Sequence, residues 1–429
     1  MQRMKASVTT SLSLCMVLFL TLCIVLAEGT RVYYLRCKAM EAMELAEFSV
    51  LSEYQKELFE DYGLFFLDLD YEQGREQTAI LESRLENYLQ KNLEEGKTES
   101  LSVSNFRRAT DGDGAVFLLQ AVEQVKADYG YQIWETLFDG MGNVKPDALD
   151  LEEILNASES QLPEIALPDL SFPSVKALRT AIFENEESLS DKSLILSERL
   201  LKRRKSQGVG GGEGVGFAQM HLFDLYLFRN FSYYGSENEQ VPKEALEYQL
   251  EYIIAGEDSD AKNLENIMWR IFLLRAGGNY LFYHQDAGHL AKAEAKAAAW
   301  IGFTGNVGLI QLLRELFLIA QAIEDGIDQT KTVFLGGTVP LYENGVFAGI
   351  SLGYEQYLYL FLKAAGKKEK IYRSMDVVEL EVRKSSGYED FRLDHCVDGF
   401  EVEWTYCYDG LIYSQRYEHT IQRKINYEM

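Results

Sequence analysis

The chain has few cations, cysteines and prolines for its length. The first two shortages argue against a nucleic-acid partner and against a disulfide framework. Its 42 Lys and Arg residues face 67 Asp and Glu residues, which leaves a formal net charge of −25 at pH 7. That charge repels the phosphates of nucleic acids and anionic lipid headgroups, so we expect no nucleic-acid partner. Five cysteines are an odd number, unsuited to a disulfide framework. Because 47% of the residues are hydrophobic, we expect a folded, acidic protein.

An apolar run stands at the N-terminus, where no charged residue occurs between Lys5 and Glu28. As a helix rising about 1.5 Å per residue, residues 6–27 span roughly 33 Å, enough for the hydrocarbon core of a bilayer. A cleaved signal peptide is the alternative, since Val25 and Ala27 fit a cleavage site. No polar spacer precedes that site, which favours a retained anchor in contact with the lipid bilayer.

The orientation of this anchor follows from the short basic tail before it. A tail of five residues stays easily in the cytoplasm, whereas a long acidic domain is translocated largely regardless of its charges. We therefore predict a single-pass protein of the cell membrane with a cytoplasmic N-terminus and residues 28–429 outside. The nearby cations are Arg3 and Lys5 before the run and Arg31, Arg36 and Lys38 after it.

The helix that begins in the membrane is expected to continue outward to about Asp61, because no proline precedes Pro146. A stripe of mainly small residues follows it at spacings of 4, 3, 4 and 3, which permits close helix packing. Packing on the protein's own domain is favoured, and packing on another subunit is the alternative. The candidate membrane-interface and assembly positions are Glu28, Arg31, Leu35, Ala39, Ala42, Ala46 and Ser49.

The remaining pattern predicts an α+β fold with a mainly helical external part and a C-terminal antiparallel meander. Helices are expected over 75–95 and 115–138, with a turn at Asp111–Gly114 between a strand at Leu101–Arg107 and the second helix. The predicted organisation is a tail and anchor (1–27), a helical region with the long membrane-proximal helix (28–145), a proline-rich connector with a basic helix and a glycine-rich loop (146–216), a helical core (217–370) and a sheet (371–429).

The sheet is predicted from alternating apolar and polar residues that begin at Val378, Leu380 and Val382. Asp398-Gly399 and Asp409-Gly410 have the composition of two-residue hairpin turns. In that register Cys396 lies opposite Glu401 and is not the cross-strand partner of Cys407. Whether either cysteine forms a disulfide stays open.

One motif has the pattern of a nucleophile elbow, namely Gly349-Ile350-Ser351-Leu352-Gly353. Asp376 or Asp394 followed by His419 would complete a serine hydrolase triad in the usual order. That fold needs alternating strands and helices before the serine, and the preceding chain is mostly helical. We therefore predict no catalytic residue and no enzyme, with a serine hydrolase as a remote alternative.

Metal and cofactor sites are not expected either. His284 and His289 are five residues apart and point to different sides of a helix. Asp111-Gly-Asp-Gly is too short for a calcium loop. The glycine-rich segment 208–216 lacks the Gly-Lys-Ser/Thr ending of a phosphate-binding loop.

Several blocks together resemble a family of uncharacterised, membrane-anchored surface proteins associated with Tad (tight adherence) pilus gene clusters of Gram-positive anaerobes. The N-terminus is similar to Tad minor pseudopilins, whose apolar helix ends in Glu-x-x-Arg, here Glu28 and Arg31. The resemblance implies a non-catalytic structural or assembly component of a pilus-like apparatus, with protein partners; a surface ligand-binding module is the alternative. The blocks are residues 5–9, 28–31, 54–67, 248–275, 336–337 and 376–383.

Overall fold

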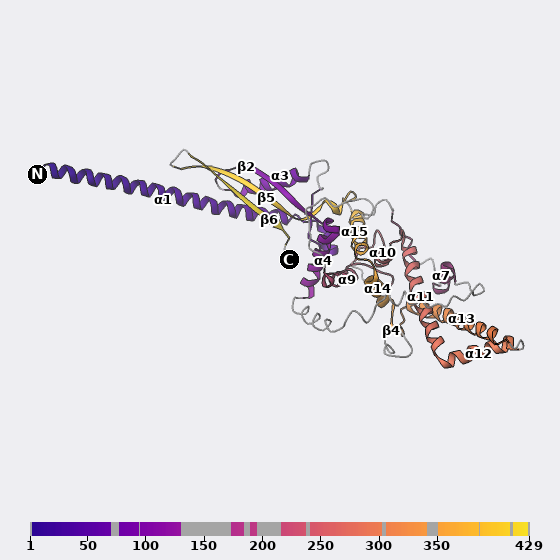
Figure 1. Ribbon diagram of the computed structural model, residues 1–429. Coiled ribbons are helices and arrows are strands. Elements are labelled where there is room, and N and C mark those ends of the chain that lie inside the picture. The colour runs from indigo at the N-terminus through magenta and orange to yellow at the C-terminus, as the bar shows by residue number, and fades with distance from the viewer. Residues whose placement is uncertain are drawn as a thin grey trace. The chain divides into compact units, whose positions relative to one another are not determined.

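The computed structural model shows mostly helices with antiparallel strands, which confirms the α+β class (Figure 1). The chain divides into two compact units. The first contains the described residues of 1–120 and 391–429, and the second those of 121–204 and 215–390. The structure describes residues 2–69, 77–93, 95–129, 173–183, 189–194, 216–236, 241–302, 306–340, 351–385, 387–411 and 415–427.

The first unit begins with α1 (Gln2–Leu51), a helix of 50 residues that no proline interrupts. The predicted continuation from the apolar run is thus confirmed, although the helix ends ten residues earlier than expected. A short helix, α2 (Lys56–Tyr62), is closed by Gly63 in the left-handed conformation at φ 65°, which favours glycine. The predicted helix over 75–95 is α3 (Gln77–Asn92).

The sheet of the first unit joins the two ends of the chain. Its strands are β1 (Leu67–Asp68), β2 (Lys97–Arg108), β5 (Cys396–Asp409) and β6 (Arg416–Asn426). Strand β5 is central and pairs antiparallel with the other three. The C-terminal strands therefore form an antiparallel sheet as predicted, and N-terminal strands complete it.

The core of this unit lies on one face of β5, where every second residue is apolar and buried. Helices α1 and α3 supply the other side of this core. The opposite face carries exposed residues such as Glu401 and Glu403, as expected for a sheet covered on one side. The buried residues of β5 on the covered face are Phe400, Val402, Trp404, Tyr406 and Tyr408.

The second unit is helical, apart from a two-stranded hairpin of β3 (Val339–Pro340) and β4 (Ser351–Leu352). Helix α11 packs against α13, and α12 against both. Its helices are the end of α4 (Asp111–Tyr129), α7 (Val175–Ile182), α9 (Phe217–Asn230), α10 (Gln249–Ala255), α11 (Asp260–Gln285), α12 (Ala287–Ile301), α13 (Val307–Phe334), α14 (Tyr354–Ala364) and α15 (Lys367–Lys384).

Two predictions about the C-terminal region are wrong. Val378, Leu380 and Val382 lie in helix α15 and not in a strand. The charged residues between them are also buried, because Glu379 and Glu381 accept hydrogen bonds from Arg383 and from backbone amides, so the alternation does not mark an exposed face.

Asp398-Gly399 lies inside β5 and makes no turn, because Asp398 is bound by Arg107 at 2.6 Å through both carboxylate oxygens. The register predicted for Cys396 is therefore wrong: it pairs with Asp68, and Cys407 pairs with Glu418 and Lys97. All five cysteines are free.

The predicted turn at Asp111–Gly114 is the start of α4, where residues 112–114 have positive φ. The basic helix, residues 208–215 of the glycine-rich loop and most of the connector lie outside the described residues.

Candidate membrane anchor and its junction with the sheet

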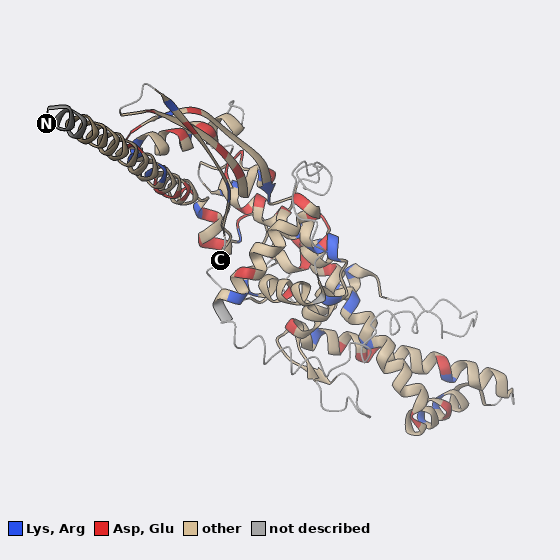
Figure 2. Ribbon diagram, turned by 60° about the vertical axis from the view of Figure 1, so that its left-hand side comes forward, with Lys and Arg blue, Asp and Glu red and all other residues tan. Residues whose placement is uncertain are grey.

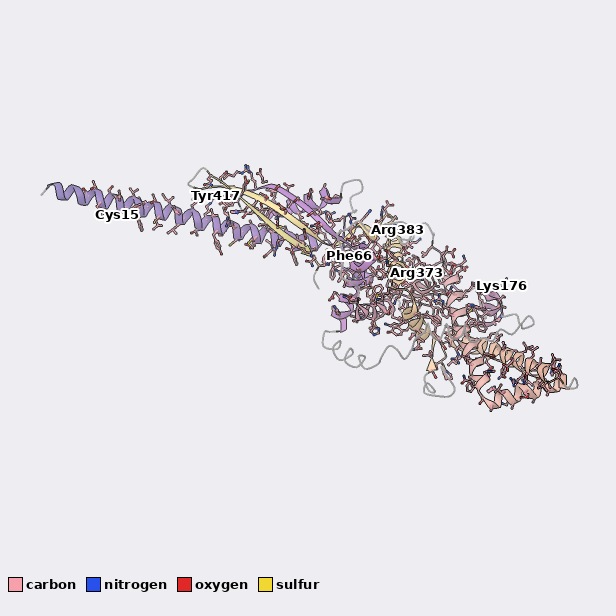
Figure 3. All side chains as sticks on the ribbon, viewed as in Figure 1. Cys15, Phe66, Lys176, Arg373, Arg383 and Tyr417 are labelled. Carbon is pink, nitrogen blue, oxygen red and sulfur yellow. The ribbon has the colours of Figure 1, made fainter. Side chains whose placement is uncertain are left out.

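The N-terminal half of α1 has the composition and exposure of a membrane-spanning helix. Ten large apolar side chains between Leu12 and Leu26 are each more than half exposed, on all sides of the helix. No charged residue occurs in this half after Lys5, charges return at Glu28, and Cys15 projects away from the protein (Figures 2 and 3). The hydroxyl of Thr21 donates to the carbonyl of Leu18 at 2.8 Å, so its polar group is satisfied within the helix. The helix is long and apolar enough to cross a bilayer.

Glu28, the first charged residue after the apolar run, is fixed to the sheet. Its side chain is only 4% exposed, and Oε1 accepts a hydrogen bond from the backbone amide of Leu411 at 3.1 Å. Leu411 lies in the connection between β5 and β6. The folded unit therefore contacts α1 at the residue directly after Ala27, with no linker between them.

Arg31 makes a second attachment one turn further along α1. Its Nη1 donates to the backbone carbonyl of Asp409 at 2.9 Å, and its Nη2 donates to Glu95 at 2.7 Å. Arg31 and Glu28 are three residues apart and so lie on the same side of the helix. Together they hold the β5–β6 connection and the residues just before β2 beside the turn of α1 that follows the apolar run.

The predicted stripe of small residues is buried within the chain's own first unit. Leu35, Ala39, Ala42 and Ala46 are at most 3% exposed, whereas Ser49 is half-buried and donates its hydroxyl to a backbone carbonyl of α1. Small side chains here let α1 approach the sheet closely. Met43 and Val50 lie in the same core and were missed by the spacing argument, which followed small residues only.

A row of aromatic rings on the sheet faces this stripe. Trp404 and Tyr406 stack with centroids 4.9 Å apart, and Tyr408 stacks on Tyr417 at 5.6 Å. Beside them the Arg36 Nε donates to Nε2 of His419 at 2.7 Å. Burial and the charge of Arg36 both lower the pKa of His419, which keeps the imidazole neutral and able to accept that bond.

The side of α1 away from the buried stripe is uncovered and carries large apolar residues around Glu44, whose side chain is 61% exposed. Tyr33, Met40 and Phe48 are 71%, 55% and 75% exposed, and Cys37 is exposed between them. At 100° per residue these four positions fall within about 80° of one another, on the side away from the buried stripe, and Glu44 among them reaches Arg423 of β6 at 3.4 Å. Their spacing is visible in the sequence, but the small residues form the more regular pattern.

The residues of the nucleophile-elbow motif are only partly described. Ser351 is an exposed residue of β4, followed by α14, while Gly349 and Ile350 lie outside the described residues. The triad candidates have other partners: Asp376 accepts from Tyr252 at 3.0 Å, and Asp394 is paired with Arg392 at 2.7 Å. Within the described ranges, no group of three or more His, Cys, Asp or Glu residues is placed to hold a metal ion.

The second unit buries several charges that the sequence did not single out. Asp224 of α9 is 2% exposed and accepts from Lys370 at 2.6 Å and Lys363 at 2.8 Å. Glu251 of α10 is fully buried, and burial raises its pKa to about 7. These residues come from helices far apart in the sequence, so they join the packing of α9, α10, α14 and α15.

The fold and the junction together define an α+β protein with one N-terminal helix long enough to span a membrane. A family model matches residues 174–347 and 343–408, which is more than half of the chain. The protein therefore belongs to the family of unknown function DUF5702. No curated protein and no solved structure matches it.

Proposed function

We propose that this protein is a non-catalytic structural or assembly component of a pilus-like (Tad) surface apparatus, held in the cell membrane by α1. The N-terminus lies in the cytoplasm and residues 28–429 lie outside. The observation that carries this proposal is the continuous path of α1 from the apolar segment into the sheet, fixed at Glu28 and Arg31. Such a joint places the folded unit rigidly at the membrane, as an assembly subunit requires.

The uncovered side of α1 supports a protein partner. Tyr33, Met40 and Phe48 place exposed apolar side chains along the outer part of the same helix, around the exposed Glu44. Exposed apolar surfaces of this kind mark interaction sites, and a neighbouring membrane-anchored helix is held parallel to this one by the bilayer. The stripe that includes Ala42 is occupied by the protein's own sheet, so the outer side is the one left for a partner.

The orientation is tested with a membrane-impermeant maleimide on intact cells. Cys37 is exposed, whereas Cys396 and Cys407 are buried and Cys15 and Cys23 lie in the apolar half of α1. We expect labelling that disappears in Cys37→Ser. Labelling only after the cells are opened would place residues 28–429 in the cytoplasm and contradict the proposal.

The assembly role is tested by photo-crosslinking in living cells. A benzophenone amino acid at Met40 or Phe48 is expected to capture a pilus component, and one at the buried Ala46 is not. Cells that lack this protein should assemble fewer surface filaments and recover with the wild-type gene. Normal filaments in those cells, together with no adduct from either outer position, would contradict the proposal.

The absence of catalysis is tested separately at Ser351. A fluorophosphonate probe should give the same signal with wild-type protein and with Ser351→Ala. Labelling that depends on Ser351 would instead support a serine hydrolase.

A further inference from the structure

Two arginines of the second unit lie close together where α10, α11, α14 and α15 pack. Arg270 lies in the middle of α11, and Arg373, labelled in Figure 3, lies in α15. Both side chains are half-buried. Burial and the charge of Arg373 each lower the pKa of Arg270, and no carboxylate in the described part of the chain offsets them. Two like charges in a partly buried place are unfavourable unless an anion joins them.

The position of Arg373 is fixed by the end of α10. Its Nη1 donates to the backbone carbonyls of Ile253 at 2.9 Å and Ile254 at 2.8 Å. Gly256 ends α10 with φ 76°, and a Cβ at this position would lie 2.5 Å from Cζ of Arg373. Glycine thus permits both the left-handed turn and the close approach of the guanidinium. The fold therefore holds the charge of Arg373 beside Arg270.

Arg270 is not compensated in the same way. It forms no hydrogen bond and no ion pair within the described ranges, and its Cζ lies 6.0 Å from the centroid of the Phe361 ring. The ring can orient the guanidinium, but it supplies no acceptor in the plane of the N–H groups. Glu265, the acidic residue of α11 nearest to Arg270 in sequence, pairs instead with Arg179 at 2.7 Å. The N–H groups of Arg270 therefore still need an anionic acceptor.

We propose that Arg270 and Arg373 form a binding site for a carboxylate group. The planar guanidinium of Arg270 matches the two oxygens of a carboxylate, and Arg373 adds a second positive charge. A phosphate suits the place less, because Arg373 lies against the C-terminus of α10, where carbonyl groups repel a dense negative charge. Leu273, one turn after Arg270 and 44% exposed, offers a contact for apolar atoms attached to the carboxylate.

Either a free small acid or the carboxylate of a partner protein would supply this group. The site is independent of the anchor α1 and of any pilus-like assembly, because all its residues belong to the second unit.

Chemical modification of the full chain in detergent tests the site directly. Phenylglyoxal reacts with accessible guanidinium groups, so mass spectrometry should find Arg270 modified faster than Arg314, which is paired with Glu315 at 2.7 Å. An excess of hexanoate should slow the reaction at Arg270 at least about fivefold, because the carboxylate covers its N–H groups. Sodium chloride at the same ionic strength should not. Equal protection by chloride, or none by hexanoate, would overturn the proposal.

Two substitutions separate the charge of Arg270 from its shape. Arg270→Lys keeps the charge without the planar fork, so the affinity for hexanoate in isothermal titration calorimetry should fall at least about tenfold. Arg270→Met should abolish binding and, without ligand, should melt no lower than the wild type, since it removes an uncompensated charge. The matched control, Lys292→Gln, removes an exposed charge from α12 and should bind like the wild type. Unchanged affinity in both Arg270 variants would contradict the assignment.

A short peptide distinguishes the two sources of the carboxylate. N-acetyl-alanyl-leucine with a free C-terminus should displace hexanoate, whereas its C-terminal amide should not. Tighter binding of this peptide than of hexanoate would support the terminus of a partner protein, and the reverse order would support a free small acid. Equal binding of the amide, or tighter binding of inorganic phosphate than of either acid, would overturn the choice of a carboxylate.

Discussion

At the scale of single residues, the buried charges of the second unit are held in different ways. Glu251 uses one oxygen, Oε1, to accept from the hydroxyl of Tyr354 at 2.6 Å and from the backbone amide of Tyr234 at 2.8 Å. Its Oε2 is buried without a hydrogen-bond partner within the described residues. Burial therefore disfavours the ionised form, and nearby Asp260 adds repulsion, which explains a pKa raised to about 7.

Glu251 should make stability fall as the pH rises. Its folded pKa of about 7 exceeds the ordinary value of 4.5, so the folded state binds the proton more tightly. The stabilisation is complete below pH 4.5 and lost as the pH rises through 7, a change of about 3 kcal/mol. Relative to the wild type, Glu251→Gln should gain that amount between pH 4 and pH 8, measured by urea unfolding in detergent.

The control for this prediction is Glu294→Gln, at a side chain that is 58% exposed. Its free energy of unfolding should differ from that of the wild type by a constant amount across the pH range. If the free energies of unfolding of Glu251→Gln and the wild type changed in parallel with pH, Glu251 would not be held as the structure describes.

Asp224 compensates the charge of Lys370, which is 3% exposed. Because Asp224→Asn leaves that ammonium buried and unpaired, we expect a loss of about 3 to 5 kcal/mol in the free energy of unfolding. Adding Lys370→Met should restore most of the loss, since no buried charge then remains. Glu60→Gln, in an exposed pair with Lys56, should change stability by less than about 1 kcal/mol. If the changes in the free energy of unfolding caused by Asp224→Asn and Lys370→Met simply added in the double variant, the pairing would be contradicted.

At the junction of α1 with the sheet, the sequence identifies the residues on α1 but not their partners on the sheet. Glu28 and Arg31 could be identified because they are the first charges after an apolar run. Their partners, Leu411 and Asp409, lie more than 370 positions away and carry no local signal. Only the pairing of β5 with β6 brings that connection to α1.

At the scale of elements, α1 has one side that is packed and one that is exposed. Ala46 is fully buried against the sheet, so Ala46→Leu should overpack the contact and cost about 1 to 3 kcal/mol. Met40→Leu on the exposed side keeps the volume and should change little. Near-UV circular dichroism of the aromatic row and thermal unfolding measure both. Equal melting temperatures for the two variants would contradict the described packing.

The helix predicted over 75–95 from its helical pattern was found within three residues of its expected ends, as α3 (Gln77–Asn92). The failure at α15 has a physical cause, because this helix is buried on most sides. Its carboxylates serve as hydrogen-bond acceptors for other segments, for example Glu381 for the amides of Ala245 and Leu246. A periodicity argument assumes that charged residues face water, and it gives the wrong period where they do not.

At the scale of the whole molecule, the second unit is an insertion within the first. The described residues of the first unit come from 1–120 and 391–429, and those of the second come from the chain between these segments. Linear segmentation of the sequence could not show this, since hydrophobic patterns do not report which distant strands pair. The α+β class was predicted correctly because it depends on which helices and strands are present and not on how they are connected.

Membrane attachment should depend on α1 alone under alkaline conditions. After a carbonate wash the wild type should remain with the membranes, because its apolar segment is buried in lipid. A variant without residues 6–27 should be released, since α1 holds the one helix among the described residues that is long and apolar enough to cross a bilayer. N-terminal sequencing of the membrane fraction should begin at or near Met1. A shortened N-terminus after Ala27 would instead indicate a cleaved signal peptide.

The direct joint between the apolar half of α1 and the sheet also fixes the distance of the sheet from the end of the apolar segment. From Glu28 to Leu51 the helix rises about 36 Å at 1.5 Å per residue, and the sheet is fastened to this stretch from its first residue. With α1 in the membrane as proposed, the first unit would therefore keep a fixed height above the membrane surface. Moving α1 outward along its axis by one helical turn would raise the sheet by about 5 Å. A force on the anchor would therefore move the helix and the sheet as a single body.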